Sequence, residues 1–211
     1  MLKKKENSNS NINDARILYY DFFAGLFIYD LLDYRSELLL EQIKILKQIE
    51  EDEKKEHFSI IESSIKEYST KNLLLEYTNL FMLPFNTNIN TKKVNDKEES
   101  NAAMLYLSYY LDGSIAGVGL SIAKEKVKKS KIRLNDVSFK ENEEHFGFLL
   151  LFCKKLLQNK EFSLQKEVLK ECLYPMYNNI CKSLEQLGEE YLYYHISIIL
   201  KEFLDFESSV G

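Results

Sequence analysis

The sequence predicts an all-α fold, a single-domain helical bundle, and three observations lead to this prediction. Only 7 of the 211 residues are Gly and 2 are Pro, too few turn formers for a sandwich or barrel of many short strands. The hydrophobic fraction is 45%, which is enough for a sizeable core. Leu, Lys and Glu, which favour helix, are abundant, and apolar residues recur at helical spacing along most of the chain.

The first half of the chain contains four segments with the periodicity of amphipathic helices. Residues 1–13 precede them and are rich in Lys, Asn and Ser, so we expect a flexible N-terminal tail there. Asp14 is a suitable cap for the first helix, and Pro84 marks the end of the fourth. The predicted helices span residues 15–32, 36–50, 58–68 and 72–81.

The second half begins with residues 85–100, which have no periodicity and collect Asn, Thr, Lys and Asp, so we expect a loop or hinge. Ser138 and Glu141 match a capping box and predict the start of a strongly apolar helix. Gly188 is suited to end the helix that precedes it. Helices are predicted at residues 102–111, 115–127, 138–157, 162–184 and 189–206. The all-helical domain thus covers residues 14–207, and residues 208–211 form a short C-terminal tail.

Composition argues against several classes of protein. The net charge is −5 and no basic stripe is present, which is not typical of a nucleic-acid binder. Cys153, Cys172 and Cys181 form no C-x-x-C pair and are odd in number, so they are expected to be reduced thiols of a cytoplasmic protein. The apolar residues 17–32 are interrupted by charges, so we expect neither a signal peptide nor membrane insertion.

Two short motifs stand out from this helical background. The first, at residues 76–84, reads Glu-Tyr-Thr-Asn-Leu-Phe-Met-Leu-Pro, and the second is the acidic-His pair Glu144-His145, which precedes an apolar segment. Together they resemble the TorD/DmsD family of cytoplasmic, all-helical chaperones for molybdenum-cofactor enzymes. The pattern can be followed from about Leu73 to Leu157. The chain resembles a divergent member, because Leu83 stands where the family usually has Gly.

The resemblance implies a function and a binding site. It implies a system-specific chaperone that binds the twin-arginine signal peptide, the apoprotein, or both, of a respiratory molybdoenzyme such as a formate dehydrogenase or an S-/N-oxide reductase. Cofactor insertion would then precede export, with no catalytic step and no cofactor of the chaperone's own. The implied peptide-binding residues are Tyr77, Leu80, Phe81, Pro84, Glu144 and His145. On this basis Glu144→Lys is expected to weaken leader binding without unfolding the protein.

The sequence offers little support for a metal site. None of His57, His145 and His195 has a Glu three residues before it, so the Glu-x-x-His signature of di-metal bundles is absent. Glu141 and His145 are four residues apart, which on a helix would make them either a surface pair or a polar anchor in a groove. Residues 113–119 carry three glycines without the Lys of a phosphate-binding loop, so a turn and close helix packing explain them better.

Two other functions remain open at this point. One is a general all-helical adaptor, which would bind its partner without preferring paired arginines. The other is a helical enzyme that binds a metal or a nucleotide. The identity of the client and the oligomeric state are likewise open.

Overall fold

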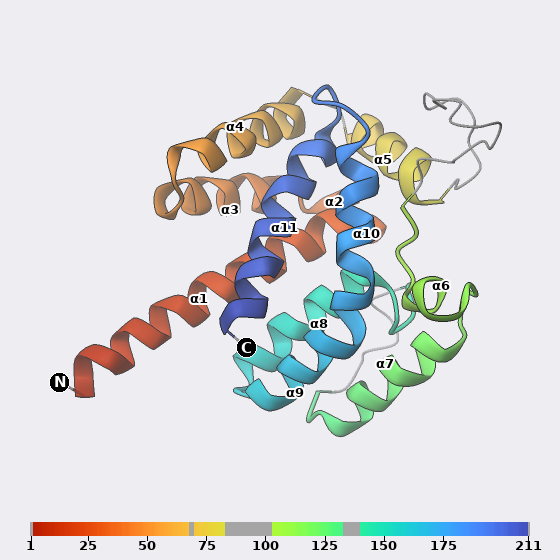
Figure 1. The fold of residues 1–211 in the computed structure, drawn as a ribbon. Coiled ribbons are helices and arrows are strands. Elements are labelled where there is room, and N and C mark those ends of the chain that lie inside the picture. The colour runs from red at the N-terminus through yellow and green to blue at the C-terminus, as the bar shows by residue number, and fades with distance from the viewer. Residues whose placement is uncertain (1, 68–69, 83–102, 133–139, 211) are drawn as a thin grey trace. The chain divides into compact units, whose positions relative to one another are not determined.

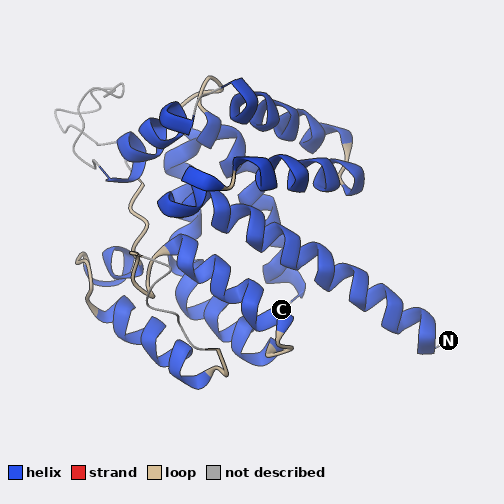
Figure 2. Cartoon of the chain, turned by 180° about the vertical axis from the view of Figure 1, so that it is seen from behind, coloured by secondary structure: helices blue, strands red, loops and turns tan. Residues whose placement is uncertain are grey.

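The computed structural model describes residues 2–67, 70–82, 103–132 and 140–210, and over these residues the chain forms helices joined by loops (Figure 1; Figure 2). No strand is present among them, and a single bridge pairs Tyr106 with His145. The predicted all-α class is therefore confirmed. Within the described ranges, every helix is too short or too polar to span a membrane.

The chain divides into two compact units, each of which combines two separate stretches of sequence. Met1–Leu31 and Tyr106–Pro175 form the first unit, and Leu32–Leu105 and Met176–Gly211 form the second. The chain passes from one unit to the other within α2 (Tyr29–Tyr34), before Tyr106, and again within α10 (Tyr174–Glu185).

The first unit is built around α8 (Phe146–Gln158), which packs along α1 (Leu2–Phe27). Gly147 allows their close approach, because a Cβ there would lie 2.6 Å from the carbonyl oxygen of Phe27. The rings of Phe27 and Phe146 meet edge-on, with centroids 5.2 Å apart. The remaining elements of the unit are α6 (Leu107–Asp112), α7 (Val118–Lys129), α9 (Phe162–Val168) and the π-helical turn η2 (Leu169–Leu173).

In the second unit, α4 (Asp52–Glu67) packs against both α3 (Ser36–Ile49) and α11 (Leu192–Val210). The Nδ1 atoms of His57 and His195 lie 2.9 Å apart and link α4 to α11. The unit also contains α5 (Thr70–Tyr77), which continues into the π-helical turn η1 (Thr78–Met82), and most of α10.

Several helix boundaries differ from the sequence prediction. Helix α1 begins at Leu2 and so extends into the predicted tail, whose flexibility stays a prediction. Helix α8 begins at Phe146 instead of the predicted capping box, because the Asn142 side chain accepts the backbone N–H of Glu144 at 3.2 Å and forms a turn. The predicted helix at 162–184 widens into η2 just before Pro175, which has no N–H to continue the α-helical pattern. The predicted loop at 85–100 lies outside the described residues.

Candidate functional site

Glu144, one of the predicted binding residues, is fully buried in the first unit, and hydrogen-bond donors surround its carboxylate. Oε2 accepts the backbone N–H of Ser108 at 2.8 Å and also the Ser108 hydroxyl. Oε1 accepts the backbone N–H of Ala116 at 2.7 Å and the side-chain amide of Asn142 at 3.4 Å. Four donors therefore bind this carboxylate, which ties α6 to the loop between α6 and α7.

The same network shapes the α6–α7 loop. The Ser108 hydroxyl oxygen accepts the backbone N–H groups of Gly117 and Leu120, at 2.9 and 3.3 Å. A Cβ on Gly119 would lie 2.4 Å from the backbone nitrogen of Ser108, so only glycine fits there. Ala116 itself adopts a φ of 62°. The glycines of this segment thus serve a turn and close packing, as the sequence indicates.

His145, the second member of the acidic-His pair, is also buried. Its Nε2 lies 3.9 Å from Glu141 Oε2, and Glu141 accepts the Tyr106 hydroxyl at 2.8 Å. No group among the described residues hydrogen-bonds its Nδ1. Burial lowers the pKa of His145 to about 3, so the imidazole is neutral at pH 7. The prediction that Glu141 and His145 lie on one face of a helix is wrong. Helix α8 starts only at Phe146, and a turn brings the two side chains together.

The first motif lies in the second unit, on α5 and η1. The rings of Tyr77 and Tyr193 both pack edge-on against Phe81, with centroids 4.9 Å from it in each case. All three rings are buried. This aromatic cluster fixes the α5–η1 segment against the start of α11. A π-helical turn is a feature often found at functional sites, which makes the adjoining surface of interest.

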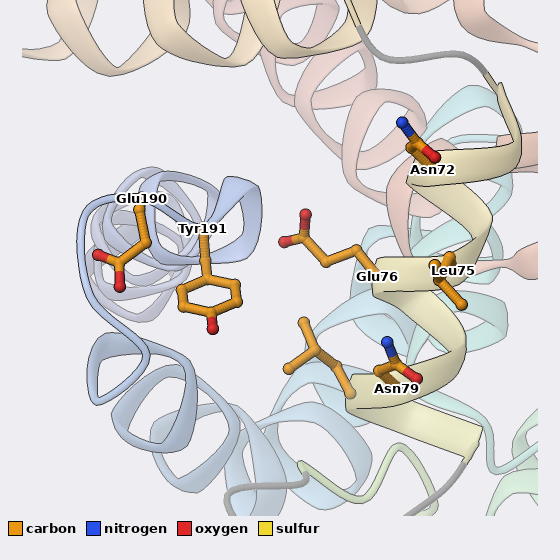
Figure 3. Close-up of a pocket in the computed structure, with 7 residues that line it drawn as sticks. Asn72, Leu75, Glu76, Asn79, Glu190 and Tyr191 are labelled. Carbon is orange, nitrogen blue, oxygen red and sulfur yellow. The ribbon is translucent and has the colours of Figure 1, made fainter. Parts of the chain in front are cut away.

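A cavity of about 390 Å³ opens beside this cluster (Figure 3). Leu80, a predicted site residue, is nearly buried at its wall. Glu76 extends from α5 into the cavity, toward the turn between α10 and α11 that carries Glu190 and Tyr191 (Figure 3). The full lining consists of Asn72, Leu75, Glu76, Asn79, Leu80, Glu190 and Tyr191. The cavity is therefore both acidic and partly apolar.

The position of Glu76 follows from the start of α11. The first N–H groups of a helix have no partner within the helix, and a carboxylate close to them is favourable. Glu76 Oε1 accepts the backbone N–H of Tyr193 at 3.3 Å, and the N–H of Leu192 also hydrogen-bonds the carboxylate. Burial nevertheless dominates and raises the pKa of Glu76 to about 7, against the lowering effect of these two N–H groups.

The six predicted binding residues fall into separate parts of the molecule. Tyr77, Leu80 and Phe81 lie together in the second unit, and Pro84 lies outside the described residues. Glu144 and His145 belong to the first unit. Their role in binding stays a prediction.

The predicted site residues did not include the polar residues of the cavity, among them Asn72, Glu76, Asn79 and Glu190. Glu76 stood inside the first motif, so the signal for it was present. No comparable signal marked Glu190, which reaches the cavity only because the α10–α11 turn folds back toward α5.

Possible metal ligands are scattered over the described parts of the chain. The described residues contain no group of three or more His, Cys, Asp and Glu side chains that could hold a metal ion.

A family model described as the nitrate reductase delta subunit matches residues 46–182, which is more than half of the chain. The chain belongs to the nitrate reductase delta subunit family. This membership confirms the TorD/DmsD resemblance that the two motifs indicate, and it places the chain among redox enzyme maturation chaperones, whose partner is a redox enzyme.

The fold of this family member is also found in a solved structure. The crystal structure of a candidate redox enzyme maturation protein from Archaeoglobus fulgidus is similar, with a TM-score of 0.57 and 21% sequence identity. The match covers 90% of this chain and 93% of that chain. At this identity the likeness shows the fold alone. A comparison with curated proteins gives no match.

Proposed function

We propose that this family member is a cytoplasmic, system-specific chaperone of one respiratory molybdoenzyme. It binds the twin-arginine signal peptide of that enzyme, its apoprotein, or both. It retains the enzyme until the molybdenum cofactor has been inserted, and only then does export follow. The chaperone itself carries out no covalent step.

Family membership over residues 46–182 is the observation that carries this proposal. The chemistry of the cavity supports it, because a twin-arginine leader is a basic segment followed by an apolar one. Glu76 and Glu190 provide the negative charge of the cavity. Leu75, which also lines the cavity, and Met82 at the end of η1 are each more than half exposed. Charged groups would set register and association rate, while apolar contacts supply most of the affinity.

In this proposal most of the predicted binding residues support the binding surface from beneath and do not contact the client. Tyr77, Phe81, Glu144 and His145 are buried, so they support the elements around them, and Leu80 contributes part of the cavity wall. Pro84 lies outside the described residues, and its part in binding stays a prediction. The exposed residues around the cavity then make the direct contacts.

Calorimetric titration of the protein with leader peptides from the host's molybdoenzymes tests this function. We expect tight binding to one leader, and weaker binding when both arginines of that leader are replaced by lysine. A pull-down with the mature apoenzyme covers the case in which the client is recognised outside its leader. If neither the leaders nor any apoenzyme binds, the proposal is wrong.

A further inference from the structure

The cavity between α5, η1 and the α10–α11 turn contains a carboxylate that the fold leaves without a positive partner. Among the described residues, no Lys, Arg or His side chain forms an ion pair with Glu76. Tyr191 lies across the cavity from it, and Glu190, whose carboxylate lies close to Gly188, also lines the cavity (Figure 3). Removing a carboxylate from water without a compensating cation costs free energy, as the raised pKa of Glu76 shows. A cation that enters the cavity would recover that cost.

We propose that this cavity receives one positively charged side chain of the client segment, a guanidinium group, which pairs with the carboxylate of Glu76. This inference rests on the proposed function and names the chemical group that the chaperone reads. Glu190 supplies a second negative charge at the exposed side of the cavity, and the Tyr191 ring offers a flat surface against which a guanidinium can stack.

The geometry favours a guanidinium over an ammonium group. Both of the backbone N–H groups that bind Glu76 come from the start of α11, so the opposite side of the carboxylate faces the cavity. A planar guanidinium presents several N–H donors in a fixed fork, and it can donate two of them to one carboxylate at once. An ammonium group is a more strongly hydrated point charge, and leaving water costs it more.

The size of the cavity admits a side chain together with part of its backbone. Its volume of about 390 Å³ is near the lower end of the roughly 300–1,000 Å³ typical of ligand sites. Leu80 and Leu75 provide apolar surface for the methylene groups of an arginine side chain. A free guanidinium compound has the same head group but lacks the flanking residues, so it is expected to bind more weakly than the peptide.

Binding of a cation should be linked to the protonation of Glu76. Because burial raises the pKa of Glu76 to about 7, its carboxyl group is partly protonated at neutral pH, and the cation binds the ionised form. Affinity should therefore rise about tenfold between pH 6 and pH 8. The other titratable groups around the site are Glu190 and Tyr191 across the cavity, and Tyr77 and Tyr193 behind it. Burial raises the pKa of Tyr193, which stays neutral over this range.

The matched test compares Glu76→Gln with Glu53→Gln. The Gln side chain keeps an oxygen that can accept from the start of α11. The control makes the same chemical change at an exposed position of α4 in the same unit. Binding of the client leader is measured by calorimetry from pH 6 to pH 8. We expect Glu76→Gln to lose about 10- to 100-fold in affinity together with the pH dependence, and Glu53→Gln to match the wild type. Wild-type affinity and wild-type pH dependence in folded Glu76→Gln would overturn the inference.

A second measurement uses only the wild-type protein and so does not depend on the folding of a variant. At pH 7, titrations in buffers of different ionisation enthalpy should show release of about half a proton per bound leader. Leaders in which one arginine at a time is replaced by citrulline, which is neutral but of similar shape, identify the arginine that enters the cavity. If no single replacement weakens binding and no proton is released, the inference is wrong.

The outcomes separate this inference from the proposed function. If the leader binds Glu76→Gln as tightly as the wild type, the chaperone function stands, but the cavity does not recognise the leader. Absence of binding by leader and apoenzyme alike overturns both. Methylguanidinium is titrated alone as a further probe: if it binds more tightly than the leader, the cavity serves a free small molecule and the assignment to a client side chain fails.

Discussion

Replacement of Glu144 by Ala should destabilise the first unit strongly. The carboxylate binds the N–H and hydroxyl of Ser108, the N–H of Ala116 and, more weakly, the Asn142 amide. Each buried donor left without an acceptor costs about 1–3 kcal/mol. The three stronger donors together should lower the free energy of unfolding by roughly 3–6 kcal/mol, since water will reach some of them. That is a large part of the roughly 5–15 kcal/mol by which a domain is stable.

Thermal unfolding followed by circular dichroism measures this loss. At about 2–4 °C per kcal/mol for a chain of this size, Tm should fall by roughly 6–24 °C. The control is Glu143→Ala, which removes the same charge one residue earlier from a partly exposed position and should change stability by less than about 0.5 kcal/mol. Hydrogen exchange of the Ala116 and Gly117 amides should accelerate only in Glu144→Ala. Equal Tm values for the two variants would refute the hydrogen-bond network of Glu144 as a source of stability.

Glu144→Lys should lose stability as Glu144→Ala does. The sequence alone suggested that this variant would stay folded.

Three further predictions concern packing and pH. Phe81→Ala should lower stability by about 3–5 kcal/mol in denaturant titrations, because two aromatic rings pack against it, and weaker client binding should accompany the loss. Gly147→Ala should cost about 1–3 kcal/mol, since its Cβ would collide with the Phe27 carbonyl, and an unchanged denaturation midpoint would contradict the close contact. His145 has a pKa of about 3 in the fold against an ordinary value of 6.5. Its contribution to the free energy of unfolding is therefore present above pH 6.5 and is lost as pH falls toward 3. His145→Gln should flatten the pH dependence of unfolding in that range by about one proton.

Much of the fold could be predicted because its helices obey local rules. The apolar spacing of α3 and α4 is visible in the sequence, and the structure buries those same positions, including Leu39, Ile43 and Phe58. Helix ends are harder to predict from the sequence, because they depend on side chains that are distant along the chain. The first turn of α11 is capped by Glu76, more than a hundred residues earlier in the chain, and no local pattern contains that information.

The candidate site shows why residue type alone does not separate support from recognition. Glu76 and Glu144 are both glutamates in family-like motifs, yet the resemblance implied a binding role for Glu144 alone. Glu144 has four donors from its own fold and no exposed surface, so a client can reach it only by unfolding the loop that it holds. Glu76 receives two N–H groups and still faces a cavity, so it keeps unused capacity for a cation. The difference arises from tertiary packing, and it makes Glu76 the better position at which to look for recognition of a basic client.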